Sequence, residues 1–156
     1  MGVRPKLPPF WSLGWMQASY NWTDQQQVED VVSNYNASKM PLDTLFLDIP
    51  YMNNYVDFSV DTKKFPSLPA FIGKLHANKQ QIIPIIDAGI SAEDLTNKYY
   101  SIGNKDDIFI KSGLYNSTKY NNNLINEVWP KVAVFVDWFN DKCINMWSQG
   151  LHDLYD

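Results

Sequence analysis

Residues 42–52 read LDTLFLDIPYM, and this pattern is the clearest structural signal in the chain. The apolar run Thr44–Leu47 shows no polar alternation, which is typical of a strand covered on both faces, as in a parallel sheet. Asp48 follows this run directly, and no further apolar residues hide its carboxylate. Ligands of α/β proteins bind at the carboxyl ends of parallel strands. Asp48 is therefore the first candidate for contact with a ligand.

Two further hydrophobic runs also end in an aspartate: IIPIID ends at Asp87 and VAVFVD ends at Asp137. This repetition indicates that several strands deliver carboxylates to a binding site. Pro84 lies inside the first of these two runs and counts against a central strand, because proline has no N–H for the ladder. Asp is also a favoured cap and turn residue, so each acid could instead stabilise the start of a loop. For Asp87 and Asp137 we favour this structural role, or support of the residues that touch the ligand.

The remaining chain alternates between strand and helix patterns. A polar segment, residues 92–126, interrupts the alternation and is predicted to be a hairpin insertion with a short strand at 108–110. Alternation of this kind implies an α/β fold with a parallel sheet and outer helices. The other predicted elements are a strand over 10–17, a helix from a Thr23–Gln26 capping box to about Lys39, a helix over 68–78, and an amphipathic helix from Phe139 to the C-terminus.

Composition excludes several function classes. The net charge is −4 without a basic run, so a nucleic-acid partner has no electrostatic support. No apolar stretch approaches the ~20 residues that cross a bilayer, so no membrane partner is expected. Cys143 is a single cysteine, and the two histidines show no metal-ligand spacing. We therefore expect no cofactor and no metal. The 15% aromatic residues suit a sugar-binding cleft, although any single one could be core.

Three N-x-S/T sequons begin at Asn21, Asn36 and Asn116. They are compatible with a parent protein that is secretory, lysosomal or extracellular. The first residues contain no hydrophobic signal core, so the sequence leaves the localisation open.

Four motifs lie in order along residues 8–156: PPFWSLGW (8–15), LDIPYM (47–52) with Asp57-Phe58, IDAGIS (86–91), and VWP (128–130) with FVDW (135–138). Together they resemble the start of the catalytic barrel of glycoside hydrolase family 31. Its members include α-glucosidases of the lysosomal, sucrase-isomaltase and glucosidase II types. The resemblance implies a partial TIM (β/α)8 barrel: an extended lead-in over 1–9, then an incomplete barrel over 10–156 with about three βα units and the insertion hairpin. A complete barrel needs about 250 residues.

The resemblance also implies which residues bind the terminal glucose. Asp48 falls on an acid that accepts hydrogen bonds from sugar hydroxyls, and a carboxylate can accept two such bonds at once. Ile49, Ile90 and Trp129 fall on the apolar and aromatic walls of the pocket, and Tyr20 falls on an aromatic residue near its mouth. The sequence departs from the family at Pro50, where a second acid is usual, and at Ala88, where proline is usual.

Family members are retaining enzymes, and their nucleophile lies in a Trp-x-Asp-Met-Asn-Glu motif that is absent from this sequence. We therefore assign no catalytic residue. The expectation is a fragment of a retaining α-glucosidase that acts on terminal α-linked glucose of oligosaccharides. It would supply pocket residues, be inactive alone, and need the rest of the barrel and a β-sandwich domain. The alternative is a non-catalytic carbohydrate-binding module derived from such an enzyme.

Overall fold

The computed structural model describes residues 4–155, which divide into two compact units. The first unit comprises the chain up to Tyr51 together with Asp61–Ile85. The second unit comprises Met52–Val60 and the chain from Ile86 onwards. Each unit has its own sheet, so each is described separately.

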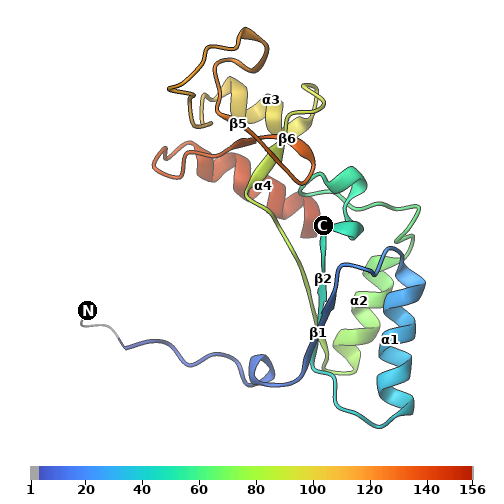
Figure 1. The fold of residues 1–156 in the computed structure, drawn as a ribbon. Helices are drawn as coiled ribbons and strands as arrows, with labels where there is room; N and C mark the ends of the chain where they lie inside the picture. Colours follow the sequence, from blue (N-terminus) through green and yellow to red (C-terminus); the bar gives the residue numbers. More distant parts are fainter. Residues whose placement is uncertain (1–3, 156) are drawn as a thin grey trace. The chain divides into compact units, whose positions relative to one another are not determined.

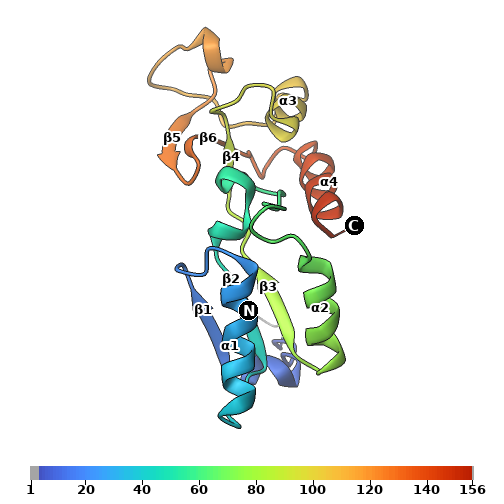
Figure 2. The same cartoon turned by 90° about the vertical axis from the view of Figure 1, so that its right-hand side faces the viewer.

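The first unit contains a three-stranded parallel sheet in the order β1-β2-β3. The strands are β1 (Met16–Ser19), β2 (Thr44–Leu47) and β3 (Gln81–Pro84). Helices α1 (Gln25–Ala37) and α2 (Leu68–Ala77) connect them and lie on the same face of the sheet (Figures 1 and 2). The parallel sheet predicted from the alternation of strands and helices is confirmed for these elements.

Pro84 is accommodated because of its position in β3. The N–H of Ile85 donates to the carbonyl of Leu47 in β2, over 2.9 Å. Successive N–H groups of a strand point alternately to its two sides, so the nitrogen of Pro84 faces away from β2. The missing N–H therefore removes no hydrogen bond from the β2–β3 pair.

The strand predicted over residues 10–17 is wrong at its beginning. Residues Phe10–Leu13 form a short 3₁₀ helix, η1, and β1 starts at Met16. Local turns take the backbone hydrogen bonds of this segment, since the N–H of Ser12 donates to Pro9 and that of Gly14 to Trp11. Phe10 is 90% exposed, so the apolar pattern does not mark a buried strand here.

The predicted capping box of Thr23 and Gln26 is wrong by one residue, and the helix is capped by Asp24 and Gln27 instead. Asp24 is the N-cap, and its Oδ1 accepts a hydrogen bond from the N–H of Gln27 over 3.0 Å. The Oε1 atom of Gln27 accepts in return from the N–H of Thr23 over 2.9 Å. These two bonds satisfy backbone donors that no helical carbonyl can reach, and they fix where the helix begins.

The second unit contains an antiparallel sheet in the order β4-β6-β5. Its strands are β4 (Gly89–Ser91), β5 (Ile125–Val128) and β6 (Lys131–Phe135), and its helices are α3 (Lys98–Lys105) and α4 (Cys143–Tyr155). The implied parallel direction of the VAVFVD run is therefore wrong. Val128 pairs with Lys131, which leaves a two-residue connection between β5 and β6. Such a short connection can join antiparallel strands but not parallel ones.

The polar segment 92–126 differs from the prediction in two ways. Residues 98–105 form α3, and the hairpin lies mostly after the segment, in β5 and β6. The strand candidate at 108–110 makes an isolated antiparallel bridge, from Phe109 to Val136. The last predicted helix is confirmed from Cys143, whereas Phe139 precedes it and is fully exposed.

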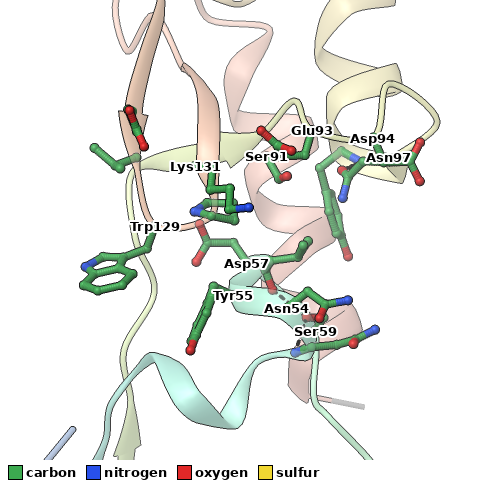
Figure 3. A pocket seen from close by; sticks show the side chains of 16 residues that line it. Asn54, Tyr55, Asp57, Ser59, Ser91, Glu93, Asp94, Asn97, Trp129 and Lys131 are labelled. Carbon is green, nitrogen blue, oxygen red and sulfur yellow. Dashed lines mark hydrogen bonds between the residues drawn. The ribbon is translucent and has the colours of Figure 1, made fainter.

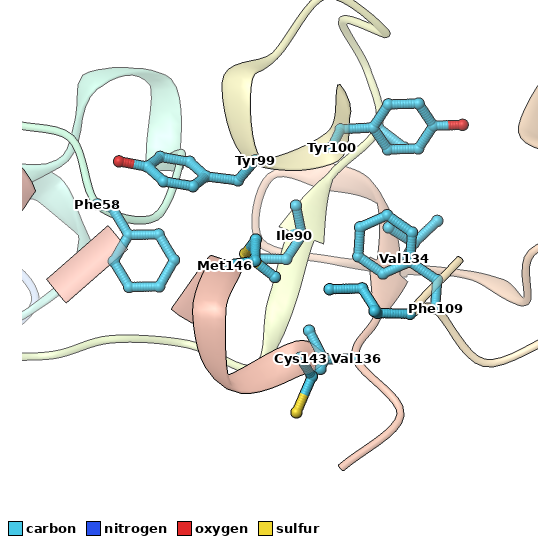
Figure 4. Close-up of a cluster of buried hydrophobic side chains, with 11 residues drawn as sticks. Phe58, Ile90, Tyr99, Tyr100, Phe109, Val134, Val136, Cys143 and Met146 are labelled. Atoms are coloured by element: carbon cyan, nitrogen blue, oxygen red, sulfur yellow. The ribbon is translucent and has the colours of Figure 1, made fainter. Parts of the chain in front are cut away.

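Phe58 stands within the hydrophobic cluster of the second unit (Figure 4). Its ring lies 4.8 Å from that of Tyr99 and 5.0 Å from that of Trp147, measured between centroids. A side chain at Gly150 in α4 would collide with the Phe58 ring, because an added Cβ would lie 2.6 Å from it. The close packing of α4 on Phe58 thus depends on glycine. The other buried members of the cluster are Ile90, Ala92, Tyr100, Ile108, Phe109, Val134, Val136, Cys143 and Met146.

A polar network also connects α3 to α4. The carboxylate of Asp153 accepts hydrogen bonds from Lys98, from the hydroxyl of Tyr99 over 2.7 Å, and from Gln149 over 2.9 Å. The bonds from Lys98, Tyr99 and Gln149 hold the pKa of Asp153 below its ordinary value. This cluster of charge-assisted bonds fixes the end of α4 against the start of α3.

Candidate functional site

The carboxyl edge of the parallel sheet carries two of the predicted site residues. Ser19 of β1 pairs in register with Leu47 of β2. Tyr20 and Asp48 follow these paired residues directly, so they leave neighbouring strands at the same edge. Tyr20 is 44% exposed, and Asp48 is partly buried. The first unit therefore places an accessible aromatic ring and a carboxylate where α/β folds hold their ligands.

The carboxylate of Asp48 makes one recorded hydrogen bond within residues 4–155. Its Oδ1 atom accepts from the N–H of Ile49 over 2.8 Å. A bond of this kind is also what a turn-stabilising acid makes, so it fits both interpretations of Asp48. The turn is held further by Tyr51, whose hydroxyl donates to the carbonyl of Ile85 over 2.8 Å. Asp48 thus lies in a turn that two hydrogen bonds stabilise, and its carboxylate can accept further hydrogen bonds.

The two isoleucines of the predicted pocket wall are buried. Ile49 lies in the first unit and is 2% exposed. Ile90 lies in the second unit, is 1% exposed, and belongs to the hydrophobic cluster around Phe58. The described residues do not bring either side chain to an open surface. Their contact with a sugar stays a prediction.

A cleft of about 840 Å³ lies within the second unit (Figure 3). Three segments form it: the loop 53–59, residues 91–99, and the β5–β6 hairpin at 127–131. Among the predicted site residues, Trp129 lines this cleft and is 52% exposed. Its ring centroid lies 5.8 Å from that of Tyr55, at an interplanar angle of 55°. The cleft therefore has an aromatic wall.

The polar centre of the cleft is Asp57, which is 2% exposed. Its Oδ1 atom accepts a hydrogen bond from the N–H of Asp87 over 2.9 Å. Its Oδ2 atom has no partner among the described residues. Burial raises the pKa of Asp57 to about 7, the hydrogen bond from Asp87 opposes this, and the charge of Asp87 adds to it. A carboxyl group with such a pKa is present near neutral pH in both its acid and its ionised form.

Asp87 and Asp137 each make a hydrogen bond, and their supporting role stays a prediction. The backbone of Asp87 donates to Asp57, as described. The Oδ1 atom of Asp137 accepts from the N–H of Phe139 over 3.0 Å and so stabilises the turn before α4. Asp57, in contrast, received no functional role from the sequence. In the sequence, Asp57 appeared only as part of the Asp57-Phe58 pair that accompanies the LDIPYM motif.

No group of three or more His, Cys, Asp or Glu residues could hold a metal ion within residues 4–155. No helix there is both long and apolar enough to span a bilayer.

Comparison with known proteins identifies relatives over nearly the whole chain. A family model described as "Glycosyl hydrolases family 31 TIM-barrel domain" matches residues 5–156. The chain is 35% identical over 149 residues to intestinal sucrase-isomaltase of Suncus murinus, which covers 93% of this chain and 8% of that protein. It is 34% identical over 155 residues to alpha-glucosidase 2 of Bacillus thermoamyloliquefaciens, covering 97% of this chain and 18% of that protein.

Solved structures share the fold. The glucosidase II alpha subunit in its Glc1Man2-bound form superposes with a TM-score of 0.77 at 25% identity, over 88% of this chain and 14% of that chain. The chain therefore spans less than a fifth of the length of each of these three relatives.

Proposed function

Because the chain belongs to glycosyl hydrolase family 31, we propose that it forms the first part of the catalytic barrel of a retaining α-glucosidase. The enzyme would release terminal α-linked glucose from oligosaccharides. Strands β1, β2 and β3 would be the first three barrel strands, and residues 89–136 the insertion. The observation that carries the proposal is the position of Asp48, next to Tyr20 at the carboxyl edge of the parallel sheet. We prefer the proposal of an enzyme to that of a non-catalytic module because the relatives of this chain are named as glucosidases.

The proposed contribution of this chain is substrate binding. Asp48 accepts hydrogen bonds from two sugar hydroxyls through charge-assisted contacts. Tyr20 and Trp129 offer exposed rings for the apolar faces of a sugar. Ile49 and Ile90 are assigned to the apolar wall of the glucose pocket from the family motifs alone, since both side chains are buried in the described residues. Each of these five contacts can be tested by its own substitution.

The chemistry itself is proposed to come from elsewhere in the enzyme. Retaining hydrolysis needs two carboxyl groups about 5–5.5 Å apart, one as nucleophile and one as acid and base. The Trp-x-Asp-Met-Asn-Glu motif is absent from residues 1–156, so we place neither catalytic group here. Asp48 is assigned to binding, Asp87 and Asp137 to support.

Replacement of Asp48 by Asn is expected to weaken glucose binding by about tenfold to a hundredfold. The substitution keeps the shape but removes the charge, and a hydrogen bond to a charged group contributes about 1.5–3 kcal/mol. The measurement is an NMR titration of the chain with glucose, read from the amides around Tyr20 and Asp48. Asp137→Asn is the matched control and should bind like the unmodified chain. Equal affinities of D48N and the unmodified chain would remove Asp48 from the site.

The 156-residue chain alone is expected not to hydrolyse p-nitrophenyl α-glucoside. The physical reason is that the proposed chain holds no nucleophile and acid/base pair. Release of p-nitrophenol is followed by absorbance, with the Asp48→Ala variant purified in parallel to reveal a contaminating glucosidase. Turnover that survives repeated purification and disappears in the variant would show that the chain is itself catalytic.

A further inference from the structure

We propose that the cleft around Asp57 in the second unit is a separate subsite, which binds a neutral sugar unit of the oligosaccharide. This inference rests on the proposed function, because it assumes an oligosaccharide substrate. It adds binding residues in the loop 53–59 to those assigned above, and it uses Trp129 of the β5–β6 hairpin, which was already assigned to sugar contact. Three independent observations support it: an unpaired buried carboxyl oxygen, an exposed aromatic pair, and a charge balance that disfavours anions.

The first observation is the unpaired Oδ2 atom of Asp57. A buried polar atom without a hydrogen bond destabilises the fold, so a ligand donor that reaches this atom recovers part of that free energy. A sugar hydroxyl suits both forms of the acid, since it donates to the carboxylate and accepts from the protonated group. Figure 3 shows Asp57 among the lining residues, between Tyr55 and Lys131. The unsatisfied group therefore belongs to the wall of the cleft.

The second observation is the aromatic wall formed by Tyr55 and Trp129. Both rings are accessible, at 37% and 52% exposure, although their centroids are only 5.8 Å apart. Tyr55 is presented by a constrained turn, in which Asn54 and Tyr55 have φ angles of 52° and 60°. Such left-handed conformations cost free energy for residues other than glycine, so the turn must be held by its surroundings. The N–H of Asn53 donates to Ser59 across this loop over 3.0 Å.

The third observation is the charge of the lining. The cleft carries four acidic residues and one lysine. Two of the acids have partners in the chain: Glu93 accepts from the N–H of Val132 over 3.2 Å, and Asp94 accepts from Thr96. An excess of negative charge repels a phosphate or another anion, whereas hydroxyl donors find acceptors. A neutral, polyhydroxylated ligand with apolar ring faces matches this lining.

The test is an NMR titration of the 156-residue chain with maltotriose. Maltotriose is expected to shift the amides of residues 53–59 and 127–131, together with the carboxyl ¹³C resonance of Asp57. Tyr55→Ala should weaken this binding by about tenfold, the loss expected for about 1.4 kcal/mol of ring contact. Tyr155→Ala, which removes a 90% exposed tyrosine at the end of α4, is the matched control and should leave the affinity unchanged. Inorganic phosphate at the same concentration should cause no shifts.

The outcomes separate this subsite from the proposed function. Shifts around Tyr20 and Asp48 without shifts in the cleft would overturn the subsite and leave the role of Asp48 intact. Shifts in the cleft that persist in D48N, without any around Asp48, would support the subsite and remove Asp48 from the proposal. Equal affinities of Y55A and Y155A, or cleft shifts with phosphate, would overturn the subsite. The Asp57 resonance reports on the unmodified chain, so the test remains decisive if Y55A fails to fold.

Discussion

Replacement of Asp57 by Asn is expected to raise the free energy of unfolding at pH 8 by up to about 4 kcal/mol. Burial raises the pKa of Asp57 from 3.8 to about 7, so the folded chain binds this proton more tightly than the unfolded chain. The contribution of Asp57 to the free energy of unfolding is therefore fully present below about pH 4. This contribution is lost as the pH rises to about 7. At about 1.36 kcal/mol per pKa unit, the loss approaches 4 kcal/mol. Asn stays neutral and keeps an acceptor for the N–H of Asp87.

Urea denaturation at pH 4, 6 and 8 measures this effect. Unmodified chain and D57N should have similar stabilities at pH 4 and diverge as the pH rises, with D57N the more stable. Asp30→Asn, which alters an exposed acid on α1, is the control and should follow the unmodified chain at each pH. A stability difference between D57N and the unmodified chain that is the same at all three pH values would contradict the raised pKa.

Replacement of Gly150 by Ala is expected to lower the free energy of unfolding of the second unit by about 1–3 kcal/mol, the usual range for overpacking. The added Cβ would lie 2.6–2.7 Å from three atoms of the Phe58 ring. That ring cannot move aside easily, because it is 5% exposed and lies against Tyr99 and Trp147. The collision should exceed the gain of about 1 kcal/mol that alanine brings to a helix interior.

Gly73→Ala in α2 is the matched control, because nothing lies within 4 Å of an added Cβ there. It should raise the free energy of unfolding by about 0.5–1 kcal/mol through helix propensity alone. Urea denaturation gives both values, and amide hydrogen exchange in α4 locates the effect of G150A. A G150A variant at least as stable as the unmodified chain would show that Phe58 does not restrict residue 150.

The first sheet was predictable because its signals are local. The run Thr44–Leu47 is followed by a charged residue, α1 has a side-chain cap, and both α1 and α2 carry apolar stripes within a few residues. The second sheet was not, since the direction of β6 depends on the two-residue connection from β5 rather than on its own composition. Helix α3 was missed for a related reason. Its buried residues are Tyr99, Tyr100 and Gly103, which do not form the aliphatic stripe that usually reveals a helix.

The candidate site residues show the same contrast between local signals and signals that depend on distant residues. Asp48 could be proposed from sequence because it directly follows a strand. Its position at the carboxyl end of that strand depends only on the local sequence. Asp57 could not be assigned a role from sequence, because its burial depends on tertiary packing and its hydrogen bond comes from Asp87, far along the chain. A loop acid acquires its raised pKa only through tertiary packing, and no sequence pattern reports that.

The proline at the end of β3 also affects how the chain meets other chains. In the described residues β3 pairs with β2, and its other edge carries no strand. An exposed edge can template intermolecular strand addition, which leads to aggregation. Pro84 offers no donor on that side, so a foreign strand would lose a rung of its ladder there. The residue that argued against a strand thus makes this edge of β3 a poorer template for an added strand.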